Sequence, residues 1–229
     1  MTEYTRHVPL RSHPWSESDV STAINDIVAD GLEHFDCERF WPAHPLDGNF
    51  FGHTGFYYGA TGVIWAIDYL GRVGATKERF DFRPFLPRLM DASRAEQPDF
   101  QDYAAHGSLL VGDLGTALMV MRLDPGPAIA DLVYARANAN TSLPVRELMW
   151  GTPGSMIACT HMAAMTVEQR WRDLFTIQAA RLLRELEETD YGPLWMQDLY
   201  GPPAALSRPH AWLRREYDRV NAWLGMADR

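Results

Sequence analysis

Gly59-Ala60-Thr61-Gly62, Gly112-Asp113-Leu114-Gly115 and Gly151-Thr152-Pro153-Gly154 are three glycine pairs of the form Gly-x-x-Gly within a chain of 229 residues. Each pair opens an apolar run in which charge is nearly absent, with Asp68 and Arg122 as the exceptions. The runs cover 63–70, 116–123 and 155–165. A helix that is apolar all round has no face for solvent and is therefore buried. The pairs predict three buried helices, each of which begins at glycine.

The segments before, between and after the apolar runs are charged and amphipathic, which is typical of helices that lie on a surface. These segments cover 15–35, 82–94, 128–137 and 166–188. In the first of them, Ser16 with Asp19 three residues later is typical of a helix start. In the last, one stripe of the helix would carry Val167, Trp171, Leu174, Gln178, Leu182 and Leu186. The chain is therefore expected to alternate outer and inner helices, as helical-hairpin repeats do.

Composition excludes several classes of partner. The net charge is −9 and the isoelectric point is near 5.3, and the basic stripe that a phosphate-binding surface needs is absent, so nucleic acid is not expected to bind. No apolar run reaches the roughly 18 residues that a membrane-spanning helix needs, and residues 1–14 lack an apolar signal core. We expect one domain, without a membrane span, in the cytoplasm.

The glycines have two interpretations, and both stay open at the level of sequence. In the first, the missing side chains only let loops and neighbouring helices approach closely. In the second, the bare helix ends also present unpaired N–H groups to a central cavity that takes a small molecule or a peptide. The second interpretation predicts that six glycines face this cavity: Gly59, Gly62, Gly112, Gly115, Gly151 and Gly154.

Three longer stretches resemble successive repeats of the lanthionine synthetase C-like family, the lantibiotic cyclases. These stretches are Phe-Tyr-Tyr-Gly-Ala-Thr-Gly-Val at 56–63, Ser-Leu-Leu-Val-Gly-Asp-Leu-Gly at 108–115 and Glu-Leu-Met-Trp-Gly-Thr-Pro-Gly at 147–154. The resemblance covers 15–201. It implies an all-α fold, an α/α toroid of helical hairpins in which outer helices surround the inner ones, with an active site at one end. It also implies a partial domain at 1–201 and a tail outside the family pattern at 202–229.

The resemblance implies a chemistry as well. The family binds zinc through two cysteines and a histidine, and the metal activates a peptide thiol for addition to a dehydrated serine or threonine. The Trp-Cys-x-Gly and Cys-His-Gly segments that carry these ligands are absent from this chain. We therefore expect no metal ligands and no cofactor here, and we expect the chain to be inactive as a cyclase.

The two cysteines of the chain do not replace the missing ligands. Cys37 and Cys159 are far apart and have no partner at metal-ligand spacing. Cys159 lies within an apolar run and is expected to be a buried thiol, while the role of Cys37 stays open. His161 follows Cys159 by two residues, so the two side chains are expected on different sides of a helix. His106, before Gly107, is interpreted as a polar residue at a helix start.

Glu147 is the candidate for a catalytic residue. It stands four residues before Gly151, where the resemblance implies a carboxylate used in acid and base chemistry near the zinc, although the family has aspartate there. A carboxylate beside converging helix ends can have a shifted pKa. The alternative is that Glu147 is only a favourable charge at the start of a helix.

The family pattern stops at Gly201. Residues 192–201 resemble the approach to a fourth repeat, but charged residues follow in place of glycine pairs. One coding sequence for 211–217 gives His-Gly-Phe-Ala-Gly-Asn when it is read one base later, which is the expected motif. We therefore expect a frameshift or a truncation near Gly201 and an incomplete toroid. An open ring exposes an apolar edge, which predicts self-association or a partner.

Two other classes of function stay open. A different α/α-toroid enzyme, an epimerase or a glycosidase that acts on carbohydrate, would use paired carboxylates, for which Asp113, Glu147 and Asp198 are the candidates. A non-enzymatic helical scaffold that binds peptide would need no catalytic residue at all.

Overall fold

The computed structural model describes residues 14–41, 53–96, 107–143, 145–190 and 192–195, and these are mostly helical, as expected of an all-α fold. The outer helices are α1 (Glu17–Glu33), α3 (Leu86–Ala95, after the 3-10 turn Arg83–Phe85), α5 (Pro127–Ala139, before the 3-10 turn Asn140–Ser142) and α7 (Gln169–Arg184). The inner helices are α2 (Ala60–Arg72), α4 (Asp113–Leu123) and α6 (Thr152–Thr166). A hairpin of β1 (Glu187–Thr189) and β2 (Gly192–Leu194) follows α7.

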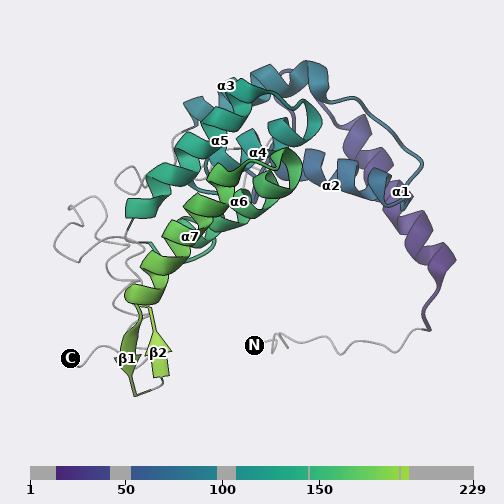
Figure 1. Cartoon of the computed structure of the whole chain (residues 1–229). Coiled ribbons are helices and arrows are strands. Elements are labelled where there is room, and N and C mark those ends of the chain that lie inside the picture. The colour runs from purple at the N-terminus through teal and green to yellow at the C-terminus, as the bar shows by residue number, and fades with distance from the viewer. Residues whose placement is uncertain (1–13, 42–52, 97–106, 144, 191, 196–229) are drawn as a thin grey trace, which may run out of the picture.

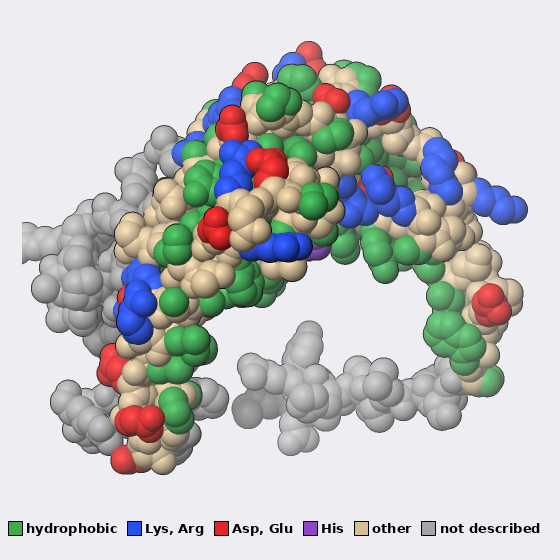
Figure 2. All heavy atoms as spheres, in the orientation of Figure 1, with side chains coloured by type: hydrophobic (Ala, Val, Ile, Leu, Met, Phe, Trp, Pro, Cys, Tyr) green, Lys and Arg blue, Asp and Glu red, His purple; other side chains and the backbone are tan. Residues whose placement is uncertain are grey.

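The helices follow one another around an arc (Figure 1). Helices α2, α4 and α6 lie toward its concave side, α3 and α5 lie on the convex side, and α1 and α7 stand at the two ends. Each inner helix packs against the next, and α3, α5 and α7 pack on α4 and α6 from outside. Hydrophobic side chains gather along part of the concave side in the space-filling view (Figure 2). The helices therefore alternate along the arc as predicted, but the prediction that the inner helices are buried all round is wrong for α2 and α6, which expose Tyr69, Ile157 and Met165.

All three inner helices begin at the predicted glycines. Gly59, Gly112 and Gly151 are the N-cap residues of α2, α4 and α6, and each has an extended backbone. The predicted cap of α1 is confirmed too, because the Ser16 hydroxyl accepts a hydrogen bond from the backbone N–H of Asp19 at 3.3 Å. Local sequence signals thus fix where these four helices start.

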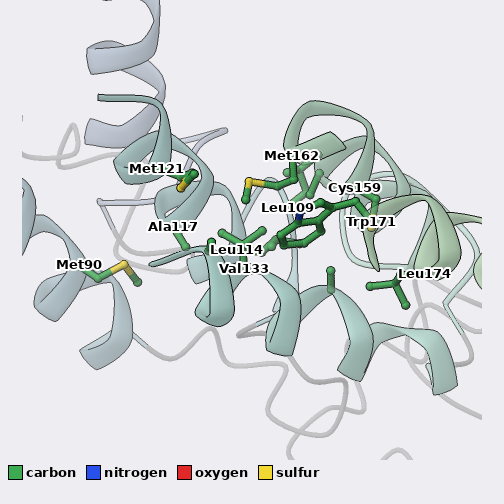
Figure 3. Packing of buried hydrophobic residues seen from close by; sticks show 13 residues of the cluster. Met90, Leu109, Leu114, Ala117, Met121, Val133, Cys159, Met162, Trp171 and Leu174 are labelled. Carbon is green, nitrogen blue, oxygen red and sulfur yellow. The ribbon is translucent and has the colours of Figure 1, made fainter. Parts of the chain in front are cut away.

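Two clusters of buried side chains form the core. The larger one joins α4, α5, α6 and α7, with Leu114, Val133, Met162 and Trp171 in contact at its centre (Figure 3). The second joins α1, α2, α3 and α4 and contains Val28, Phe40, Ala60, Ile64, Ile67, Phe82, Leu86, Leu89 and Met119. Helices α3 and α4 contribute to both clusters. The core is therefore continuous along the arc, with α4 at its middle.

The prediction of one helix over 166–188 is wrong at both ends. Helix α6 continues to Thr166, and Val167 adopts a left-handed conformation (φ 59°) that stops it, so Val167 is 84% exposed rather than buried. Helix α7 begins at Gln169 and ends at Arg184, because the chain then turns into β1. The inner part of the predicted stripe is confirmed, since Trp171 and Leu174 are buried together with Gln178 and Leu182.

The ends of α3, α5 and α7 each hold the loop that leads into the preceding inner helix. After α3, the Glu96 carboxylate accepts hydrogen bonds from the backbone N–H groups of His53 and Thr54, both at 3.0 Å. After α5, the Asn140 amide donates to the carbonyl of Gly107. Thr54 and Gly107 stand at the same position relative to the first glycine of their pairs. We call such a contact, from the end of an outer helix to this loop position, a polar clamp, and it recurs in successive repeats.

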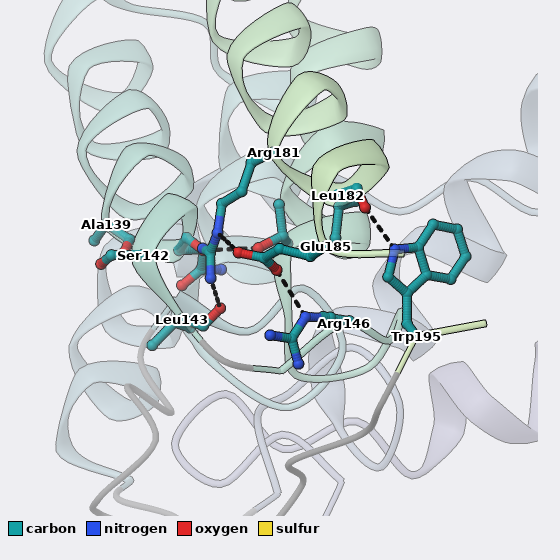
Figure 4. Close-up of polar contacts among 10 residues, drawn as sticks. Ala139, Ser142, Leu143, Arg146, Arg181, Leu182, Glu185 and Trp195 are labelled. Atoms are coloured by element: carbon teal, nitrogen blue, oxygen red, sulfur yellow. Dashed lines mark hydrogen bonds and ion pairs between the residues drawn. The ribbon is translucent and has the colours of Figure 1, made fainter. Parts of the chain in front are cut away.

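The third clamp is an ion-pair network at the end of α7 (Figure 4). The Glu185 carboxylate accepts hydrogen bonds from Nε of Arg146 at 2.7 Å and from Nε of Arg181 at 2.6 Å. Arg181 also donates to the carbonyl of Leu143 at 2.8 Å. Burial opposes ionisation of Glu185, but these hydrogen bonds outweigh it and hold the pKa of its carboxyl below the ordinary value. Arg146 occupies the same register as Thr54 and Gly107, which fixes the loop before α6.

Candidate functional site

A cavity of about 360 Å³ lies between the three inner helices. Its lining comes from α2, α4, α6 and the loops that lead into α2 and α4: Phe56, Trp65, Tyr69, Leu109, Leu110, Gly115, Leu118, Met119, Arg122, Ile157, His161 and Met165. Most of these side chains are apolar, which is typical of pockets that take small molecules or single side chains of a larger ligand. The cavity exists because successive inner helices are neighbours.

Aromatic side chains form one wall of the cavity. Trp65 and Tyr69 lie one turn apart on α2, and their rings stack at 5.2 Å between centroids with planes 10° apart. Phe56, in the loop before α2, contacts Trp65 at 5.6 Å. Three rings in sequence give a rigid apolar surface, because aromatic side chains have few rotatable bonds and large contact areas.

The charged group in the lining is Arg122, from the last turn of α4. Its Nε donates a hydrogen bond to Oδ2 of Asp68 on α2 at 2.9 Å. Nε of Arg72 donates to the same oxygen at 2.9 Å. The two charged residues of the inner runs are thus each other's partners across α2 and α4. Two other titratable side chains line the cavity, Tyr69 of α2 and His161 of α6.

Of the six candidate glycines, Gly115 lines the cavity. At four of the other five positions, a Cβ would meet the carbonyl oxygen of the residue six positions earlier. These oxygens belong to His53 for Gly59, Phe56 for Gly62, Val145 for Gly151 and Leu148 for Gly154. Gly115 has such a neighbour as well, with the carbonyl oxygen of Leu109 at 2.1 Å. The packing interpretation therefore has direct support, because the lead-in loop lies against the first turn of its helix.

The prediction that the helix ends present unpaired N–H groups is wrong for α2 and for the start of α6. The N–H groups of Ala60 and Thr61 donate to the carbonyls of His53 and Thr54 at 2.9 and 3.1 Å. The N–H of Thr152 donates to the carbonyl of Val145. The lead-in loops satisfy these donors before any ligand could, which periodicity along the sequence does not reveal.

Glu147 lies outside the cavity lining. Its carboxylate accepts hydrogen bonds from the backbone N–H groups of Met149 at 2.7 Å and Trp150 at 2.5 Å. Its carbonyl oxygen accepts from the N–H of Gly151 at 3.1 Å. This geometry stabilises the turn that leads into α6, so Glu147 has a structural role whether or not it has the catalytic one that the sequence suggests.

The candidate carboxylate Asp113 is absent from the cavity lining too. Asp113 is fully buried in the first turn of α4, where Arg136 of α5 donates to its Oδ2 from Nε at 3.0 Å and from an Nη at 2.8 Å. Asp198 and His106 lie outside the described residues. The structure does not bring Asp113 and Glu147 together at the cavity, as a pair of catalytic carboxylates would require.

The cysteines do not offer a zinc site within the described part of the chain. Cys159 is buried in the core cluster of α4, α5, α6 and α7, and burial raises the pKa of its thiol to about 11. The free thiol is therefore protonated at neutral pH, and a metal that bound it would have to displace this proton. His161 lines the cavity on another side of α6, and Cys37 is exposed after α1. No group of three metal-binding side chains occurs among the described residues.

Comparison with known protein families, with curated proteins and with solved structures found no match. Within the ranges that the structure describes, no helix is both long and apolar enough to cross a lipid bilayer.

Sequence reasoning did not assign the aromatic wall, Arg122 or His161 to a site. The isolated charges of Asp68 and Arg122 in otherwise apolar runs were the available signal, because a charge in a buried helix needs a partner. For Trp65, Tyr69 and His161 no such signal exists, because a helix that is apolar all round does not reveal which face borders a cavity.

Proposed function

We propose that this chain is a lanthionine synthetase C-like protein that binds peptide at the cavity on the inner helices and does not itself catalyse zinc-dependent cyclisation. The observation that carries the proposal is the cavity itself, lined by all three inner helices with an aromatic wall and few polar groups. A volume of about 360 Å³ suits an amino-acid side chain with its backbone. Binding without cyclase chemistry is proposed because the Trp-Cys-x-Gly and Cys-His-Gly segments, which the resemblance implies as the source of the zinc ligands, do not occur in the sequence.

The toroid and the family are part of the same proposal. The regular alternation of helices, their arc and the three glycine starts in one register support an incomplete α/α toroid of the lanthionine synthetase C-like kind. Peptide is the ligand class that the resemblance implies. The carbohydrate alternative is not favoured, because neither Asp113 nor Glu147 lines the cavity. Self-association and a cytoplasmic location stay predictions from the sequence.

Fluorescence anisotropy with a short fluorescein-labelled peptide that carries one phenylalanine tests the proposal. We expect saturable binding that Ile157→Glu weakens by about tenfold or more, because a charged, hydrated side chain would replace an apolar part of the cavity wall. Ile177→Glu is the matched control, since Ile177 lies on α7, is 56% exposed and does not line the cavity. Thermal melts check that both variants fold.

Two results would contradict the proposal. One is the absence of saturable binding to the unmodified protein at millimolar peptide. The other is an equal loss of affinity in Ile157→Glu and Ile177→Glu, which would place the binding surface elsewhere.

A further inference from the structure

The cavity combines an apolar wall with a positive charge in a chain whose net charge is −9. Arg122 lies within an apolar run of α4, and its side chain is 29% exposed. A cation with so little access to solvent is costly unless charged partners compensate it. Asp68 is the partner that the structure provides, but Asp68 also accepts a hydrogen bond from Arg72.

Asp68 is shared between two guanidinium groups. Its Oδ2 accepts hydrogen bonds from Nε of Arg122 and from Nε of Arg72, both at 2.9 Å. One negative charge between two positive charges leaves this cluster with a net positive charge of one. Arg122 reaches Asp68 through Nε, and among the described residues no hydrogen bond from its two Nη groups is found. The forked end of the guanidinium is the part that binds a carboxylate in bidentate fashion.

We propose that the cavity recognises a carboxylate adjoining an apolar or aromatic side chain, with Arg122 as the carboxylate-binding residue. The side chain would pack on the wall formed by Phe56, Trp65 and Tyr69, and the carboxylate would pair with the Nη groups of Arg122. Asp68 acts as a positioning residue, because its contact with Nε fixes the plane of the guanidinium. This inference rests on the proposed peptide binding and adds the chemical class of peptide.

Two kinds of peptide present this chemistry. The carboxylate is either the C-terminus of a peptide that ends in an apolar residue or the side chain of an acidic residue beside an apolar one. Three fluorescein-labelled probes of equal length distinguish them: a peptide with C-terminal phenylalanine and a free carboxylate, the same peptide amidated, and an amidated peptide with glutamate before phenylalanine.

Anisotropy titrations of the three probes give the test on the unmodified protein. We expect the free carboxylate to bind about 10- to 100-fold more tightly than its amide, as hydrogen bonds to charged groups predict. If the glutamate probe binds more tightly than the free carboxylate, acidic residues are the source of the carboxylate, and if the two bind equally, the cavity accepts either source. If the glutamate probe binds like the amide, the C-terminus is the source. Equal binding of all three probes would overturn the inference and leave peptide binding intact.

Arg122→Gln and Arg72→Gln are matched variants, because each removes one positive charge and one contact to Asp68, but Arg72 does not line the cavity. We expect Arg122→Gln to abolish the preference for the carboxylate while affinity for the amide stays within about twofold. Arg72→Gln should keep the preference. A preference that survives Arg122→Gln overturns the inference, and if no probe binds the unmodified protein, the proposed function fails together with it. The comparison of probes on the unmodified protein does not depend on the folding of either variant.

Discussion

The second glycine of each pair is required by a carbonyl group that occupies the place of a side chain. A Cβ on Gly62 or Gly115 would lie 2.1 Å from the backbone oxygen of Phe56 or Leu109, and one on Gly154 would lie 2.5 Å from that of Leu148. Real side chains do not approach a backbone oxygen so closely, and backbone cannot move aside as a flexible side chain can. The glycines therefore let each lead-in loop fold back over the first turn of its helix.

Gly115→Ala is expected to lower the free energy of unfolding by about 2 to 3 kcal/mol, because the added methyl group overlaps the carbonyl of Leu109. Gly31→Ala is the control, since Gly31 also lies in a helix but its nearest contact would be Cδ1 of Ile67 at 3.9 Å. There we expect stability to be unchanged or raised by up to about 1 kcal/mol through helix propensity. Urea unfolding followed by circular dichroism measures both, and equal effects would refute the steric explanation.

The starts of the inner helices could be predicted because glycine pairs and apolar runs are local signals. The loss of the helix at Val167 could not, since a hydrophobic β-branched residue in a left-handed conformation contradicts local propensity. The residues that line the cavity could not be predicted from the sequence, for a different reason. Arg122 and His161 both line the cavity because α4 and α6 pack against each other. The packing of two helices that are distant in the sequence cannot be predicted from local patterns.

At the scale of secondary-structure elements, the polar clamps join each inner helix to the outer helix that follows it. Glu96, Asn140 and Glu185 stand at or just after the ends of α3, α5 and α7, and each holds the loop before the preceding inner helix. Helix ends leave backbone groups unpaired and lie near loops, so polar side chains there have partners within reach. The repeating unit is therefore an inner helix, its lead-in loop and the next outer helix.

Glu185→Gln is expected to lower the free energy of unfolding at pH 7 by about 1 to 2 kcal/mol, because charge-assisted hydrogen bonds from Arg146 and Arg181 become neutral ones. The pKa of this carboxyl is lowered in the folded state. Its contribution is therefore complete above the ordinary pKa of a glutamate, and it is lost as the pH falls through the folded pKa. Urea unfolding at pH 7 and below pH 4.5 should show the difference between the two proteins shrinking in acid.

Glu188→Gln is the control for this clamp, since Glu188 lies on β1 and is exposed. Its effect should stay within about 0.5 kcal/mol at both pH values, as surface substitutions usually do. A difference between Glu185→Gln and the unmodified protein that is constant from neutral to acid pH would contradict the ionic role of Glu185.

At the scale of the whole molecule, stability is expected to be uneven along the arc. Helix α4 has seven buried residues and belongs to both core clusters, whereas α1 has Val28 as its buried residue and packs at one end. In repeat-like folds each unit is stabilised mainly by its neighbours, so a terminal helix with one-sided support opens at lower cost than a central one. The cavity borders α4 and α6, in the better supported part of the arc, and also α2, which carries its aromatic wall.

Native-state hydrogen exchange measured by mass spectrometry at increasing denaturant tests this gradient. We expect the amides of α1 to exchange through openings whose free energy is lower than that of global unfolding by about 2 kcal/mol or more, while those in the middle of α4 exchange only by global unfolding. Val28→Ala should lower the opening free energy of α1 further and leave that of α4 nearly unchanged, because Val28 is 2% exposed and contacts the cluster at one end of the arc. If α1 and α4 instead exchange with the same free energy, and Val28→Ala lowers both equally, the described helices unfold as a single cooperative unit and the gradient does not exist.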